Sequence, residues 1–170
     1  MSADLFSKGP DRDYAKPLPI LTATNRPYWE AAARHEFQLQ RCSACRSWIY
    51  PISVVCQSCG AQDDYVWTSL SGRATLSSWA VYRRAFAPFE PADVPYAVAE
   101  VELEEGVRLV SHVVDAEIAE YRAGLALRVA FRDLTPAISL VVFAPLSQRY
   151  NDYHCNEPTR PRGEILEADG

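Results

Sequence analysis

The sequence predicts a mainly β protein, in which an N-terminal helix and a zinc ribbon precede a small β-barrel of the OB type. Two observations lead to this fold class. Four of the five cysteines form two CxxC pairs separated by ten residues, at Cys42–Cys45 and Cys56–Cys59. From Asp63 onward, apolar residues recur at every second position in five or six short segments, which is the period of half-buried strands. Short antiparallel strands in this number fit a small closed barrel better than a sandwich.

The composition excludes several classes of protein. The chain has 170 residues, of which 48% are hydrophobic and 23% are charged, as in ordinary globular proteins. The formal net charge of -5 argues against a protein whose main function is to bind nucleic-acid backbones. No apolar run approaches the ~20 residues of a membrane helix, and Met1 to Pro19 is polar, without an apolar signal region. We therefore expect a cytoplasmic protein with no membrane and no nucleic-acid partner.

The chain divides into four predicted parts. These are an N-terminal arm and helix (1–40), a zinc ribbon (41–62), an OB-fold barrel (63–145) and a C-terminal tail (146–170). Three prolines prevent a continuous helix in residues 1–24, so this arm is either flexible or lies on a partner. The tail is polar and proline-containing, and we expect it to be irregular, with Cys155 as a surface cysteine.

Residues 25–40 are predicted to form a helix. Thr24 or Asn25 can cap its start, and Pro27 lies in the first turn, where a missing N–H costs little. Apolar residues recur at helical spacing at Tyr28, Trp29, Ala32, Ala33 and Phe37. This stripe either packs on the next module, or presents Tyr28 and Trp29 to a partner protein.

The two CxxC pairs predict a metal site. Cys42, Cys45, Cys56 and Cys59 can supply two thiolates from each of two tight turns, which completes a tetrahedral four-sulfur site. Thiolates in this geometry favour zinc, with iron less suited. Four cysteines leave no open coordination position, so the zinc would be structural. We expect residues 46–55 to form a short hairpin between the pairs, with Trp48 and Tyr50 packed on the small core of the ribbon.

The barrel strands follow from alternation. Ala97, Ala99, Val101 and Leu103 share one face of a predicted strand, and the turn at 104–106 joins it to the next strand as a hairpin. A short helix or turn is expected at 116–124. The full set of predicted strands is 65–70, 73–82, 95–103, 107–115, 125–131 and 138–143.

Signatures of free-standing catalysis are missing from the sequence. There is no GxSxG, Walker or dinucleotide-binding motif, and His112 lies in a strand where a structural role is expected. The sequence therefore favours a binding module without catalytic residues. Its candidate binding segment runs off the strand 73–82, where aromatic rings beside two arginines could stack on a base and pair with phosphates. An ordinary solvated loop is the alternative. The candidates are Tyr82, Arg83, Arg84, Phe86 and Tyr96.

An ordered series of motifs resembles one known family. In chain order they are RPYWEAA, LQRCSACRSWIYPISVVCQSCG, SGRATLSSWAVYRRAF, VPYAVAEVELEEGVRLVSHVVD and GLALRVAFRDL. From residue 17 to about 145 this series resembles the DUF35 family, in which a rubredoxin-like zinc ribbon precedes an OB-fold. Two features depart from the family pattern: Arg46 stands where glycine is common, and the tail extends beyond the core pattern.

The resemblance implies a function. Family members are accessory subunits of thiolase-superfamily complexes that carry out acyl-CoA thiolysis, Claisen condensation, retro-aldol cleavage or acetyl transfer. It implies that the four cysteines bind zinc, and that the ribbon and the leading helix, with Tyr28 and Trp29, help to dock the catalytic subunit. The OB-fold would help to hold acyl-CoA or shape the substrate channel, with the candidate binding segment contacting CoA or the partner. The catalytic cysteine and histidines would belong to the partner.

Two other classes of function stay open at this point. The chain could bind acyl-CoA or cleave thioesters alone, and zinc ribbons and OB-folds also occur in nucleic-acid-binding proteins. The second class would need a basic face on the barrel, whereas one predicted hairpin carries Glu100, Glu102, Glu104 and Glu105.

Overall fold

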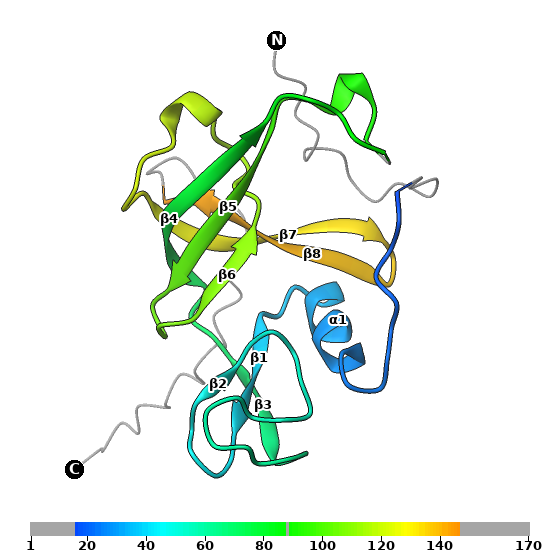
Figure 1. The fold of residues 1–170 in the computed structure, drawn as a ribbon, viewed down its shortest axis with the longest axis vertical. Coiled ribbons are helices and arrows are strands. Elements are labelled where there is room, and N and C mark those ends of the chain that lie inside the picture. The colour runs from blue at the N-terminus through cyan, green and yellow to red at the C-terminus, as the bar shows by residue number, and fades with distance from the viewer. Residues whose placement is uncertain (1–15, 88, 147–170) are drawn as a thin grey trace, which may run out of the picture.

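The computed structural model describes residues 16–87 and 89–146, which form one short α-helix, two single-turn 3-10 helices (η1 and η2) and two β-sheets (Figure 1). Residues 16–24 contain neither helix nor strand, as predicted, whereas the rest of the arm and the predicted tail from residue 147, with Cys155, lie outside the described residues. Within the described ranges, no helix combines the length and hydrophobicity needed to cross a bilayer. The elements are α1 (Arg26–Ala33), β1 (Gln38–Cys42), β2 (Trp48–Ile49), β3 (Tyr65–Ser69), β4 (Arg73–Tyr82), η1 (Pro91–Asp93), β5 (Tyr96–Leu103), β6 (Arg108–Ser111), η2 (Ile118–Glu120), β7 (Ala126–Thr135) and β8 (Ile138–Pro145).

The first sheet is the zinc ribbon. Its strand order is β2-β1-β3, and both pairings are antiparallel. The sequence placed β3 with the barrel strands, but in the structure β3 pairs along the whole length of β1, from Gln38 opposite Ser69 to Cys42 opposite Tyr65. This strand therefore belongs to the ribbon sheet.

Each CxxC pair lies in its own β-turn. Strands β1 and β2 pair across the first turn, and a bridge between Val55 and Gln62 spans the second. The predicted hairpin within residues 46–55 is therefore wrong. The physical reason is local: the backbone N–H of Cys42 donates to Ser47 O, and the N–H of Cys56 donates to Ala61 O, so pairing closes around each turn.

The second sheet curls into an OB-type barrel, as predicted. Its order is β6-β5-β4-β7-β8, with every pairing antiparallel. The register of β4 on β5 shifts between Leu76 and Ser78, so that β4 bends and pairs with β7 only near its start. The two edges meet through a parallel bridge between Val113 and Phe143. Strand β6 ends at Ser111, earlier than predicted, because the chain beyond it turns to pair with β8 through Val113.

The predicted helix over 25–40 is correct only in its first part. Helix α1 ends at Ala33, and His35 adopts a left-handed backbone with φ 59°. Beyond this turn the period changes to two, because Phe37 and Leu39 both enter the barrel core. Phe37 fitted a helical stripe in the sequence, but it belongs to the extended approach to β1.

The core is shared by both sheets. The inner face of β5 is buried at alternate residues, as the sequence predicts, and the ribbon adds Phe37 and Leu39 to the same hydrophobic cluster. The Phe37 ring meets the Phe143 ring edge to face, with centroids 6.3 Å apart. Trp48 and Tyr50 pack against this shared core, so their predicted packing on the ribbon core is wrong. The small ribbon core consists of Cys42, Ile49 and Cys56, with Ala61 and Tyr65 against it.

We expect Gly72→Ala to destabilise the protein more than Gly106→Ala. Both glycines have left-handed backbones, with φ of 73° and 81°, but a Cβ at residue 72 would collide with Val129, whereas one at residue 106 meets nothing within 4 Å. Both variants lose the glycine backbone preference, and only the first adds overpacking, worth about 1–3 kcal/mol more. Urea unfolding of the zinc-loaded proteins measures the difference. Equal losses would contradict the close packing of Gly72 on β7.

Candidate metal centre and binding surfaces

The four predicted metal ligands meet at one point in the ribbon. The Sγ atoms of Cys42, Cys45, Cys56 and Cys59 all lie within 4.8 Å of one another. The Cys42 and Cys59 Sγ atoms are 3.7 Å apart, and those of Cys45 and Cys56 are 3.6 Å apart. Tetrahedral zinc with Zn–S bonds of about 2.3 Å requires S···S separations of about 3.8 Å. The cysteines therefore fit a four-sulfur zinc site, as predicted.

The surroundings act unequally on the cysteine thiols. Against a backbone hydrogen bond from Ala61, the neighbouring Cys45 thiol and burial raise the pKa of Cys59 to about 12. Hydrogen bonds from Ser47 lower the pKa of Cys45 to about 6, and backbone N–H groups of Cys59 and Ser58 lower the pKa of Cys56. Cys42 and Cys56 are buried, whereas Cys45 and Cys59 are exposed. Because all four positions of the tetrahedron are protein sulfurs, the site supplies structure and leaves no position for a substrate.

Two of the predicted binding residues form a ring stack at the far end of the barrel. Tyr82 and Tyr96 lie directly opposite each other on β4 and β5, with ring centroids 4.9 Å apart and planes 4° from parallel. The Tyr82 side of the stack reaches solvent, and this residue is 41% exposed. Arg83 and Arg84, which follow it, are also exposed. Phe86 is 61% exposed, and no ring contact within the described residues joins it to the stack.

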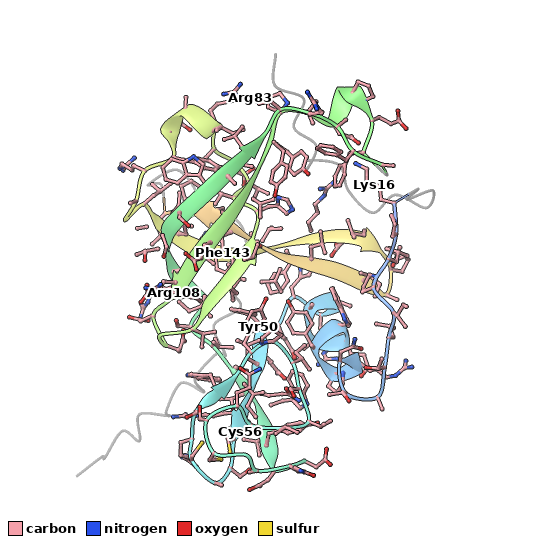
Figure 2. The ribbon with its side chains drawn as sticks, in the orientation of Figure 1. Lys16, Tyr50, Cys56, Arg83, Arg108 and Phe143 are labelled. Carbon is pink, nitrogen blue, oxygen red and sulfur yellow. The ribbon has the colours of Figure 1, made fainter. Side chains whose placement is uncertain are left out.

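Two further members of this end were missed by the sequence analysis. Phe89 stacks on Tyr96 with centroids 5.0 Å apart, and the Lys16 ammonium lies 4.7 Å from the Phe89 ring centroid. Lys16 also pairs with Asp93 at 2.9 Å. The Glu90 backbone N–H and the Lys16 ammonium hold the pKa of Asp93 below its usual range. Phe89 was visible as an aromatic residue in the loop, whereas nothing in the sequence pointed to Lys16. Figure 2 shows Arg83 and Lys16 at the end of the molecule opposite Cys56.

The other predicted pair, Tyr28 and Trp29, lines a groove where the ribbon meets the barrel. We call it the junction groove. It has a volume of about 520 Å³ and is bounded by α1, the segment 50–52, β5, β6 and β8. In Figure 2, Tyr50 marks the ribbon side of this junction, between α1 and β6. Tyr28 also packs against the shared core, and burial raises the pKa of its hydroxyl. Its ring meets Trp29 edge to face at 5.1 Å.

A histidine, an aspartate and a serine also meet at the end of α1. His35 Nε2 donates to Asp133 Oδ1 at 2.8 Å, and Ser139 Oγ donates to the same oxygen at 2.6 Å. Partial burial acts to raise the pKa of Asp133, but these two hydrogen bonds hold it below its usual range. Since the aspartate stands between the other two groups, the histidine is not placed to activate the serine as a nucleophile. The His35 ring stacks on Phe131, so the cluster fastens α1 to β7 and β8.

A four-cysteine ribbon that shares its core with an OB-type barrel defines a class of two-module proteins. Two family models match the chain: the rubredoxin-like zinc ribbon domain of ChsH2 over residues 29–64, and the C-terminal OB-fold domain of ChsH2 over residues 67–132. The chain is 31% identical to a chain of the solved Ltp2–ChsH2(DUF35) aldolase, with a TM-score of 0.67, and the match covers 75% of this chain and 98% of that one. It belongs to the DUF35 family.

Relatives of known sequence place the two modules in different contexts. A probable enoyl-CoA hydratase alpha subunit from Thermomonospora curvata is 32% identical over 131 residues, which is 76% of this chain and 40% of the relative. A DUF35 domain-containing scaffold protein from Methanothermobacter thermautotrophicus is 27% identical over 113 residues, which is 66% of this chain and 84% of the relative. The chain thus spans less than half of the hydratase subunit and most of the scaffold protein.

We expect Cys42→Ser to remove the metal and unfold the ribbon. Three thiolates and a serine hydroxyl bind zinc far more weakly than four thiolates, and β1 would lose its anchor. Wild type should carry about one zinc per chain by elemental analysis, whereas the variant should carry much less and show a less ordered near-UV circular dichroism spectrum. Cys155→Ser, outside both CxxC pairs, is the matched control and should retain its zinc. If Cys42→Ser retained a full equivalent of zinc, the metal would not be bound at the four-cysteine site.

Proposed function

We propose that this protein is a zinc-containing, non-catalytic subunit of a thiolase-superfamily acyl-transferring complex. The complex would form or break carbon–carbon bonds or transfer acetyl groups, and this subunit would help to bind acyl-CoA or shape the substrate channel. One observation carries the proposal: the likeness to a chain of the Ltp2–ChsH2(DUF35) aldolase extends over 98% of that chain. The closed four-cysteine site is consistent with it, because such a site supports a scaffold and offers no reacting position.

The docking surface for the catalytic subunit would consist of α1 and the zinc ribbon. Trp29 stands on α1 and is half-buried in this chain. The ribbon adds the exposed valines Val54, Val55 and Val66. Exposed apolar side chains grouped on one module are typical of surfaces that become buried in a complex. Tyr28 supports this surface from within, because its ring packs on the shared core.

The CoA contact would lie at the other end of the barrel. An adenine ring could extend the stack on the exposed side of Tyr82, above Tyr96, because parallel aromatic rings at this spacing accept a further ring. Arg83 and Arg84 stand beside the stack, and guanidinium groups bind phosphates with paired hydrogen bonds. The exposed ring of Phe86 adds apolar surface next to them.

Nucleic-acid binding is less well supported by this barrel. OB-folds that bind nucleic acids use the face of their second and third strands, which here are β5 and β6. On the outer face of β5 stand Glu100 and Glu102, and the latter pairs with Arg108 on β6 at 3.1 Å. Carboxylates at these positions would repel a phosphate backbone.

The tagged protein, purified from its native host, should bring down a thiolase-like catalytic subunit at comparable abundance. Mass spectrometry would identify the partner, and metal analysis of the same sample should give about one zinc per chain. A chain that elutes alone and cleaves acyl-CoA would be a stand-alone enzyme. Co-purifying nucleic acid would instead support the nucleic-acid-binding alternative, and either result would overturn the proposal.

In the purified complex, Arg83→Ala with Arg84→Ala should weaken CoA binding by about tenfold, because two charge-assisted phosphate contacts are lost. Isothermal titration calorimetry measures the Kd, and its salt dependence should decrease in the double variant. Arg108→Ala is the matched control, since it removes an exposed arginine on the same barrel that pairs only with Glu102 at the surface. If the double variant binds CoA as tightly as this control, then Arg83 and Arg84 do not contact CoA, and the CoA site does not lie at this end of the barrel.

A further inference from the structure

The junction groove is built by three separated parts of one chain. Trp29 comes from α1, Ile52 from the ribbon, and Val98, Val110 and Leu140 from barrel strands. These apolar side chains border an open groove of about 520 Å³, which is within the range of about 300–1,000 Å³ that is typical of small-molecule sites. A single side chain of a partner protein would fill only part of this space.

The groove is uncharged. Among the described residues that line it, none has a carboxylate, ammonium or guanidinium group. The one titratable base is His112, whose pKa is lowered by burial, so that the neutral imidazole is favoured. Its Nδ1 donates to Ala97 O at 3.0 Å. The Arg132 guanidinium on β7 also lowers the pKa of His112, but Arg132 does not line the groove. A phosphate or carboxylate would meet no cation on the walls themselves, so the groove disfavours anionic groups.

Most polar side chains of the groove are occupied within the fold. Ser111 Oγ donates to Val141 O at 2.7 Å, and the Asn25 amide donates to Ile20 O at 3.0 Å. An inserted peptide would bring N–H and C=O groups for which these side chains offer no partners, and unpaired backbone groups are costly. Burial, and to a lesser extent Tyr50, raise the pKa of Tyr28. Both phenols line the groove and could orient a single polar atom of a ligand.

From these three properties we infer that the junction groove binds an uncharged, largely hydrocarbon part of a small molecule, such as a ring system or an acyl chain. This site goes beyond the proposed function, because this chain forms it alone. A single side chain is too small to fill the groove, the uncharged walls disfavour a nucleotide, and the occupied polar groups disfavour a peptide. The aromatic side chains of Trp29, Tyr28 and Tyr50 offer flat surfaces suited to such a ligand.

The test uses Nile red, an uncharged lipophilic dye, with the zinc-loaded full-length protein. Its fluorescence should rise in a saturable titration with about one site per chain. Val110→Glu places a carboxylate on the groove wall and should weaken dye binding by about tenfold. Leu146→Glu is the matched control, since Leu146 is also an exposed apolar residue, 55% against 64% exposed, but follows the end of β8 and does not line the groove. Zinc content and circular dichroism confirm that both variants fold.

Competition defines the ligand class. Methyl dodecanoate should displace the dye, whereas coenzyme A without an acyl group should not. The inference is overturned if the dye does not saturate, if Val110→Glu binds it like wild type, or if both variants lose binding equally. It is also overturned if no dye binds and Val110→Glu instead abolishes capture of the catalytic subunit, because the groove would then be a protein interface. In that last case the proposed function would stand.

Discussion

The structure depends on one five-residue strand that is buried on both faces. On one face of β1, Leu39 enters the barrel core behind Phe37. On the other face, Gln40 is fully buried and Cys42 is a metal ligand. The metal site and the barrel are therefore attached to opposite sides of the same backbone. A change in zinc coordination would therefore act on β1, and through it on the packing of Phe37 and Leu39 in the barrel core.

The same strand builds the junction groove. The Gln40 side-chain carbonyl accepts a hydrogen bond from the Ser53 N–H at 2.9 Å, which fixes the ribbon segment with Pro51 and Ile52 along the groove wall. On the opposite side of the groove, the contact of His35 with Asp133 fastens the end of α1 to the barrel. Because both walls are held by buried or multiply bonded groups, the groove is a preformed feature of the fold, and its shape depends on an intact zinc ribbon.

Local chemistry made the zinc ligands and the barrel strands predictable. CxxC spacing dictates which atoms can meet on a metal, and alternation over Ala97 to Leu103 dictates which face of β5 is buried. The errors arose where distant contacts override local pattern. Phe37 fits a helix in the sequence, but the Phe143 ring draws it into the barrel core. The groove and the position of Lys16 on Phe89 were not predictable, because they depend on how separate segments pack.

The two surfaces that a ligand or partner could use are joined by β5. Tyr96 of the ring stack and Val98 of the groove stand two residues apart on its outer face, which separates them by about 7 Å along the strand. On the inner face of the same strand, Ala97 and Ala99 are buried in the core. A small shift of β5 at one surface would therefore require repacking of the core, and close-packed interiors resist such shifts. A molecule that spans both surfaces would meet them at a fixed separation, which suits a subunit that holds a substrate for chemistry performed by another chain.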